Sequence, residues 1–279
     1  MSRTRTIRRF TAVVALVGVL GCARPVEKKY REARQLHDAG HLLEAIPLYR
    51  EAIQLDPQFA PAQKGLGKAF LTLKRYEEAV PPLEQAALLE PDQSQSHLAL
   101  GEALRGAGRR GKALVSFERA SVVDPSNPLP PLYRGEVLVE QERFAEAIKA
   151  FQKTLDLDPG QARAHRGFGD CYYFLKQPER AIEHFQKALE RGETSASIYV
   201  RLGLALGNLG RNQEGIEALE KGREMAPDNA DVLLYLGQLY WDLEQWSKVV
   251  EVWDAYLKIK PEDRTTQSLI REARRRLAG

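Results

Sequence analysis

The chain has 279 residues, with 41 lysines and arginines against 38 aspartates and glutamates, a formal net charge of +3. Four of the arginines lie in residues 1–21, which contain no acidic residue, so the rest of the chain has 37 basic against 38 acidic side chains. This balance gives no case for nucleic-acid binding, which depends on a basic surface.

The first 21 residues have the layout of a secretory signal peptide. Arginines at positions 3, 5, 8 and 9 precede an uncharged stretch from Phe10 to Leu20. This stretch is too short for a membrane-spanning helix, which needs about 20 residues. The sequence from Val19 to Cys22 resembles the lipobox of bacterial lipoproteins, in which the cysteine is lipidated and becomes the first residue of the mature chain. Gly21 and Cys22 match that motif well, whereas Val19 and Leu20 are not its commonest residues. The resemblance implies a signal peptide over residues 1–21 and lipidation, such as by palmitate, at Cys22.

Two other outcomes remain open at this end of the chain. Gly21, Cys22 and Ala23 also form a small-x-small site for ordinary cleavage after Ala23, and the segment could stay uncleaved as an anchor. If Cys22 is lipidated, a short tether over residues 22–25 holds the rest of the chain close to the membrane. Basic residues that could then meet anionic head groups, or else form a solvated face, are Lys28, Lys29, Arg31 and Arg34.

Prolines and glycines recur through the rest of the chain with one period. Successive prolines are separated by 34 residues or a whole multiple of 34, and glycines stand ten residues after each proline mark. They are Pro57, Pro91, Pro125, Pro159, Pro227 and Pro261, and Gly67, Gly101, Gly135, Gly169, Gly203 and Gly237. A period of 34 residues indicates a helical repeat solenoid. One phase gives seven units over 26–263: 26–59, 60–93, 94–127, 128–161, 162–195, 196–229 and 230–263.

Each unit contains two helical stretches. The first packs through its positions 4, 7, 8 and 11 and the second through 20, 24 and 27, which are the spacings of one apolar helix face. Position 20 is mostly alanine, and position 24 is bulky: Tyr49, Leu83, Phe117, Phe151, Phe185, Leu219 and Trp253. Small residues let antiparallel helices approach, and bulky residues fill the gaps between them.

These marks resemble the tetratricopeptide repeat family over about 85% of the chain. The resemblance implies an all-α fold: a right-handed superhelical solenoid of seven helix-turn-helix units whose first helices line a concave groove for peptide segments of partner proteins. A C-terminal capping helix is predicted over residues 264–279, with one apolar face made of Leu269, Ile270, Ala273 and Leu277.

Three departures from the repeat pattern affect the expected helices. Repeat 5 has Glu193 where the others have proline, and Gly192 is expected to supply a left-handed cap instead. Pro81 and Pro82 are expected to bend the second helix of repeat 2 or to delay its start. Prolines at positions 128, 130 and 131 crowd the entry to repeat 4, where a first helical turn tolerates them.

The concave side is the expected functional surface. Positions 2, 5, 6, 9, 12 and 13 of each first helix project away from the packing face. In repeats 4–7 they are rich in aromatic residues and arginine, which anchor interfaces; packing alone is the alternative role for the tyrosines. The predicted protein-binding groove consists of Tyr133, Arg163, Arg166, Tyr173, Phe174, Arg201, Tyr235 and Trp241, with Leu132, Val200, Leu204 and Leu234 beside them.

The sequence gives no sign of catalysis, a cofactor or a metal site. Residues 106–112 match G-x-x-x-x-G-K, but Ala113 replaces the hydroxyl residue that holds magnesium, so an interhelical turn is expected. His37 and His41 lack a third ligand and are expected at the surface. Cys171 lies beside the packing face and is expected to be buried. Lys64 and Lys68 begin the carboxylate clamp of co-chaperone members of the family, but the later positions do not match, so chaperone tails are not expected partners.

Together these features predict a non-catalytic, membrane-anchored scaffold of the bacterial cell envelope that binds proteins or peptides. Ala23 is not the aspartate that retains many lipoproteins at the inner membrane, which favours the periplasmic face of the outer membrane in a diderm. Lipoproteins of this build resemble pilotins and pilus-biogenesis factors, which implies a role in pilus or secretion assembly. The alternative is a regulatory subunit or recruiter of a peptidoglycan hydrolase or protease.

Overall fold

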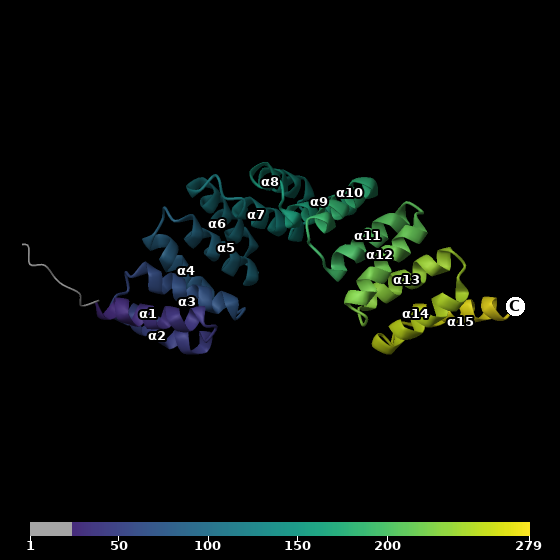
Figure 1. Ribbon diagram of the computed structural model, residues 1–279, viewed down its shortest axis with the longest axis horizontal. Coiled ribbons are helices and arrows are strands. Elements are labelled where there is room, and N and C mark those ends of the chain that lie inside the picture. The colour runs from purple at the N-terminus through teal and green to yellow at the C-terminus, as the bar shows by residue number, and fades with distance from the viewer. Residues whose placement is uncertain (1–23) are drawn as a thin grey trace, which may run out of the picture.

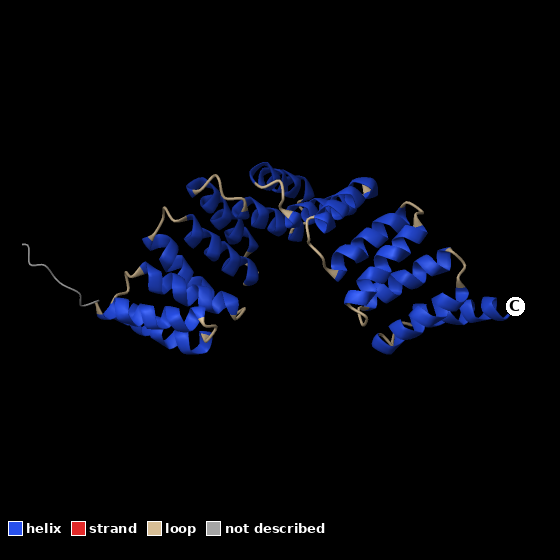
Figure 2. Ribbon diagram, in the orientation of Figure 1, coloured by secondary structure: helices blue, strands red, loops and turns tan. Residues whose placement is uncertain are grey.

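The computed structural model describes residues 24–279, which form helices joined by short turns (Figure 2). The predicted signal peptide and Cys22 lie outside the described residues. The helices are α1 (Pro25–Asp38), α2 (Leu42–Leu55), α3 (Ala60–Thr72), α4 (Tyr76–Leu89), α5 (Ser94–Gly106), α6 (Arg110–Val123), α7 (Leu129–Glu140), α8 (Phe144–Leu157), α9 (Ala162–Phe174), α10 (Pro178–Glu190), α11 (Ala196–Asn208), α12 (Asn212–Met225), α13 (Ala230–Asp242), α14 (Trp246–Ile259) and α15 (Arg264–Ala278). The predicted all-α fold is confirmed.

From α3 onward, the two helices of each repeat pack as an antiparallel pair because a glycine in the first helix faces a bulky side chain in the second. In the pair α9–α10, a Cβ added to Gly169 would lie 2.5 Å from the ring of Phe185. Real Cβ atoms do not approach so closely, so only glycine allows this ring to sit against the α9 backbone. The bulky residue at position 24 is at most 2% exposed in all seven units: Tyr49, Leu83, Phe117, Phe151, Phe185, Leu219 and Trp253.

The helix pairs stack into an arch, with α1 at one end, α8–α10 at the crown and α15 at the other end (Figure 1). The odd-numbered helices from α1 to α13 contact one another in succession, whereas successive even-numbered helices make no comparable contact. In a curved stack, neighbouring helices on the inner side lie closer to one another than those on the outer side. These odd-numbered helices therefore line the concave face. This concave face is where the sequence predicts the groove.

The ends of the helices agree with most of the departures noted in the sequence. Gly192 has φ +87° and follows the last turn of α10, so the predicted left-handed cap is confirmed. Pro130 and Pro131 lie in the first turn of α7. The expected delay of α4 is wrong, because α4 already begins at Tyr76 and contains Pro81 in its interior.

Helix α15 packs against α14 at the C-terminal end of the arch. Ile270 and Ala273 are buried there, but Leu277 is 55% exposed and lies beyond the packed part of the helix. Leu277 was therefore wrongly included in the apolar packing face. Among the described residues, no helix is both long and apolar enough to cross a bilayer.

Candidate functional site

A row of mostly charged side chains runs along the concave face at position 9 of the odd-numbered helices. We call it the position-9 row; from α1 to α13 it consists of Arg34, Lys68, Glu102, Glu136, Asp170, Leu204 and Gln238. Three carboxylates follow two cations, and the last two members are uncharged. The row brings side chains from residues far apart in the sequence onto one surface.

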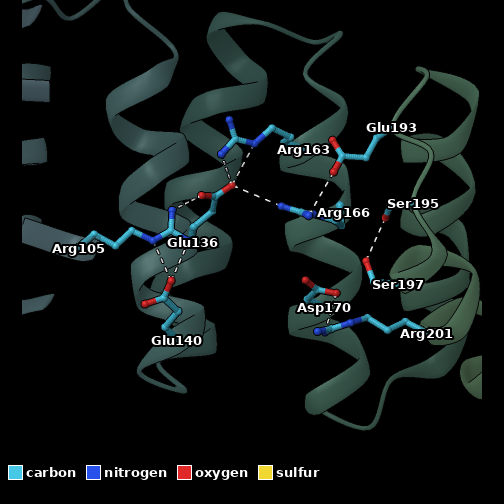
Figure 3. A network of polar contacts seen from close by, with 10 residues as sticks. All are labelled: Arg105, Glu136, Glu140, Arg163, Arg166, Asp170, Glu193, Ser195, Ser197 and Arg201. Atoms are coloured by element: carbon cyan, nitrogen blue, oxygen red, sulfur yellow. Dashed lines mark hydrogen bonds and ion pairs between the residues drawn. The ribbon is translucent and has the colours of Figure 1, made fainter. Parts of the chain in front are cut away.

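Glu136 is the most buried charge of the row, with only 9% of its side chain exposed. Three arginines surround its carboxylate (Figure 3). Arg105 reaches it from α5, while Arg163 and Arg166 approach from α9 with Nη2 atoms 2.7 and 3.5 Å from Oε1. A carboxylate removed from water needs such counter-charges, because an unpaired buried charge is strongly destabilising.

The arginines are themselves held by further carboxylates of the same face. Arg105 also binds Glu140 at 2.7 Å, and the Nε atom of Arg110 donates to Glu140 at 2.9 Å. Arg166 contacts Glu193 at 3.2 Å. The network links three consecutive repeats through ion pairs between their first helices, as Figure 3 shows.

Asp170, the next carboxylate of the row, has its own partner. Arg201 of α11 donates from Nη1 to Oδ1 of Asp170 at 2.8 Å, and the Asp170 side chain is 15% exposed. Burial raises the pKa of Asp170, and the charge of Arg201 opposes that rise. The predicted groove arginines, Arg163, Arg166 and Arg201, are therefore all engaged by carboxylates of the protein itself.

The predicted aromatic residues fall into three places rather than one cluster. Tyr133 lies 5.0 Å beneath the guanidinium carbon of Arg163 in the Glu136 network. Tyr173 is half-buried and contacts Phe174, which is 46% exposed and stacks on Phe144 with 5.2 Å between ring centroids. Tyr235 is half-buried against the C-terminal core.

Trp241 lies at the C-terminal end of the arch, where its main contacts are structural. Its ring is 5.1 Å from Trp246 and 5.7 Å from Trp253 between centroids, and Arg276 of α15 lies over it at 5.6 Å.

Two apolar residues expected beside the groove are not available to a partner: Leu132 is fully buried and Val200 is 9% exposed. Those two assignments are wrong, because both side chains pack into the hydrophobic core.

The open space of the concave face lies nearer the N-terminal half than the sequence predicts. We call the larger hollow, of about 650 Å³, the central cavity; it is lined by Leu71, Thr72, Tyr76, Glu102, Arg105, Gly106, Arg110, Tyr133, Glu140 and Arg163. A second hollow of about 330 Å³, the N-terminal cavity, is lined by Tyr30, Arg34, His37, Asp38, Tyr49, Pro61, Lys64, Gly65 and Lys68. Of the eight predicted groove residues, only Tyr133 and Arg163 line either of these two cavities.

The sequence places Glu102 and Lys68 on the concave side of repeats 1–3, but the predicted groove does not include them or the other acids of the position-9 row. The signal that could have found them is the comparison of position 9 between units, which shows carboxylates in three consecutive repeats. We instead weighted aromatic residues and arginines, which anchor many interfaces but here pack or pair within the chain.

The remaining candidates behave as ordinary structural residues. Residues 107–109 form the turn between α5 and α6, with Gly108 at φ +73°. His37 is half-buried and its Nδ1 atom lies 3.3 Å from the Tyr49 hydroxyl, so it is not a purely surface residue. Cys171 is fully buried, and burial raises its pKa to about 12. The described residues contain no group of three metal-ligating side chains.

Two family models, both described as tetratricopeptide repeat, match this chain. One matches residues 132–196 and 200–264 and the other residues 36–102, which together make up more than half of the chain. The chain belongs to the tetratricopeptide repeat family. Proteins of this family are in general interaction scaffolds rather than enzymes. No curated protein sequence matches the chain closely enough to be counted as a relative.

Solved tetratricopeptide repeat structures resemble most of the arch. PilF of Pseudomonas aeruginosa is 21% identical, with a TM-score of 0.68 over 76% of this chain and 97% of that one. PilW, described as a type IV pilus biogenesis factor, is 20% identical, with a TM-score of 0.67 over 77% of this chain and 100% of that one. Cut9, from an APC/C complex with Hcn1, is 18% identical, with a TM-score of 0.69; the match covers 88% of this chain and about half, 48%, of Cut9. At these identities the likeness concerns the fold alone.

Proposed function

We propose that this protein is a non-catalytic scaffold of the bacterial cell envelope that holds peptide segments of partner proteins in its concave groove. The observation that carries the proposal is the pair of open cavities on the concave face, lined by charged and aromatic side chains on packed helices. Side chains fixed on helices that are already packed lose little freedom on binding, which favours recognition of a flexible segment.

The groove of this proposal extends from the two cavities toward the C-terminal half. Tyr133 and Arg163 join the central cavity to the predicted groove. Tyr173, Phe174 and Arg201 continue it on α9 and α11, and the exposed edge of Phe174 offers the largest apolar contact there. YrrB, a solved repeat structure described as having an unusual peptide-binding site, is 22% identical with a TM-score of 0.57 over 67% of this chain and 96% of that one. Its fold supports the same use of a helical repeat surface.

The envelope location rests on the predicted lipidation of Cys22. Described structure begins at Arg24 and α1 at Pro25, so the lipid would lie within a few residues of the first repeat. The likeness to PilF and PilW adds support for a role in pilus or secretion assembly. The alternative role is to recruit or regulate a peptidoglycan hydrolase or protease, which would bind in the same groove. The identity of the bound partner distinguishes this role from pilus or secretion assembly.

A cross-linking experiment in cells tests the groove. A photoreactive amino acid is placed at Thr72, which lines the central cavity, and a matched one at Glu217, exposed on the even-numbered helix α12. We expect the first variant to capture a defined partner and the second not to capture it. Pilus or secretion proteins in the captured band support the assembly role, and murein enzymes or proteases support the alternative. Equal capture at both positions would reject the groove as the binding surface.

A further inference from the structure

Two charged residues of the position-9 row make no direct ion pair within the described part of the chain. Lys68 of α3 and Glu102 of α5 are both half-buried, and neither takes part in a side-chain hydrogen bond or ion pair with another described residue. Burial lowers the pKa of Lys68 and raises the pKa of Glu102. The charges of Arg163, Lys68 and Arg105 oppose the rise in the pKa of Glu102, and the charge of Glu102 opposes the fall in the pKa of Lys68, but neither group makes a direct ion pair.

The other charged members of the row are all paired. Arg34 contacts Asp38 at 3.5 Å, Glu136 has its three arginines, and Asp170 has Arg201. Lys64, one turn before Lys68, binds Glu90 at 2.6 Å. Lys68 and Glu102 are opposite in charge, but each is the position-9 residue of its own repeat, and no bond joins them.

Each of the two residues lines a different cavity. Lys68 lies in the wall of the N-terminal cavity and Glu102 in the wall of the central cavity. The other carboxylate of the central cavity, Glu140, is already bound by Arg105 and Arg110. Glu102 is therefore the carboxylate of that cavity that remains open to a ligand.

Resting on the proposed groove function, we propose that this part of the groove recognises a peptide segment with an acidic side chain that binds Lys68 and a basic side chain that binds Glu102. Such a segment supplies the direct ion pairs that Lys68 and Glu102 lack in the free protein, which favours its binding. Packed helices lie about 8–10 Å apart and an extended chain advances about 3.3 Å per residue. The two side chains of the ligand should therefore be about three residues apart.

Synthetic fluorescent peptides provide the probe. One set carries a single aspartate and a single lysine, two to four residues apart in either order, in an extended serine- and threonine-rich background. Control peptides carry the aspartate alone, the lysine alone or neither. Fluorescence polarisation with a protein of residues 24–279 measures the affinity of each peptide. One order of aspartate and lysine should bind most tightly, and a peptide that lacks either charge should bind about fivefold more weakly.

Variants of the protein then assign the charges. Lys68→Gln should abolish the advantage given by the aspartate, and Glu102→Gln the advantage given by the lysine. The double variant Lys68→Glu, Glu102→Lys should prefer the peptide with the reversed order. Lys112→Gln and Glu84→Gln make the same charge changes at exposed positions on the even-numbered helices α6 and α4, and should leave the peptide affinities unchanged.

Thermal unfolding of the same variants shows whether they fold. Because burial disfavours the charged forms of Lys68 and Glu102 and neither makes an ion pair, Lys68→Gln and Glu102→Gln should melt at or above the temperature of the unchanged protein. The proposal is overturned if no peptide with both charges binds better than the peptide with neither, or if purely acidic peptides bind best and Glu102→Gln does not weaken them. In that event, capture through Thr72 in cells would still support the groove, and its failure would reject the groove separately.

Discussion

Asp170 on α9 accepts a hydrogen bond of 2.8 Å from Arg201 on α11, and this pair joins repeats 5 and 6 on the concave face. Between these two helices, α10 ends at Glu190 and is followed by the left-handed Gly192, and Glu193 occupies the place where the other six repeats have proline. A side-chain pair thus links first helices across a junction whose turn departs from the repeat pattern.

The first prediction concerns this pair. Arg201→Ala should cost about 2 kcal/mol of unfolding free energy at neutral pH, because Asp170 is left nearly buried without its counter-charge. Asp170 already has a raised pKa, and loss of Arg201 raises it further. Because the pKa of Asp170 is higher in the folded state than in the unfolded state, the folded state binds the proton more tightly. The free energy of unfolding therefore falls as pH rises above the usual aspartate pKa. Urea unfolding should therefore show a larger loss at pH 7.5 than at pH 4.5.

A double variant checks that interpretation. Adding Asp170→Asn to Arg201→Ala removes the uncompensated charge, so most of the pH dependence created by Arg201→Ala should disappear. If the single variant loses the same free energy at both pH values, the arginine acts through packing rather than through the charge of Asp170.

The second prediction compares two neighbouring carboxylates. Glu136 is 9% exposed and is held by three arginines, whereas Glu102 has no partner among the described residues. Glu136→Gln should lower the unfolding free energy by about 3 kcal/mol, because three buried or half-buried guanidinium groups lose a shared counter-charge. Glu102→Gln should cost nothing. Chemical denaturation of both variants, which make the same chemical change one repeat apart, tests the contrast; similar losses would contradict it.

The third prediction separates packing from binding within one helix. Gly169→Leu should destabilise the protein by about 3 kcal/mol, because its Cβ would already lie 2.5 Å from the Phe185 ring. Phe174→Ala, at the exposed end of the same helix, should cost less stability and weaken partner capture through the groove. Thermal melts and the cross-linking assay on both variants measure the two effects. Normal capture by Phe174→Ala would remove that residue from the binding surface.

The fourth prediction is a loss of stability in mild acid caused by two histidines of repeat 5. The Nδ1 atoms of His165 and His184 lie 3.3 Å apart, and the His184 ring stacks on Phe168 with centroids 4.7 Å apart. Burial lowers the pKa of His184 to about 4 and also lowers the pKa of His165. The unfolded state binds protons at these two histidines more readily than the folded state does. The free energy of unfolding should therefore keep its full value above about pH 6.5 and fall by about 2 kcal/mol toward pH 4.

The variant His184→Phe tests the origin of that loss. It keeps an aromatic ring against Phe168 and removes one titrating group, so unfolding curves from pH 7 to pH 4 should become flatter. An unchanged slope would show that His184 does not cause the acid sensitivity.

The repeat architecture could be predicted from the sequence because it depends on local spacing. Glycine at position 8 and a bulky residue at position 24 specify how closely two helices approach, and both recur at a constant interval. The candidate site depends instead on which long side chains meet across repeats. Arg105 and Arg163 lie 58 positions apart yet share Glu136, and no periodic pattern states which cations a given carboxylate binds. The same reasoning left Glu102 out of the predicted groove, because the sequence does not show that its side chain makes no ion pair among the described residues.

The fifth prediction is lipidation at Cys22, which lies outside the described residues. The basis is the arginine-rich start, the short apolar stretch and Gly21 before the cysteine. Palmitate labelling in a bacterial host should mark the unchanged protein and not Cys22→Ser, whereas Cys171→Ser should keep the label because Cys171 is fully buried. Equal label in the unchanged protein and in Cys22→Ser would contradict the prediction.

Once lipidated, the protein should depend on its acyl chain rather than on basic residues for membrane binding. Of the four candidates for head-group contact, Lys29 binds Glu51 at 2.6 Å, Arg31 lies 3.8 Å from Glu27 and Arg34 lies 3.5 Å from Asp38. These pairs reduce the attraction to anionic lipid, which is otherwise about 1 kcal/mol for each cation. We therefore expect Lys28→Gln, Lys29→Gln, Arg31→Gln and Arg34→Gln together to leave flotation with anionic liposomes nearly unchanged, while Cys22→Ser abolishes it. Loss of flotation in the fourfold variant would show that these cations bind the membrane despite their internal partners.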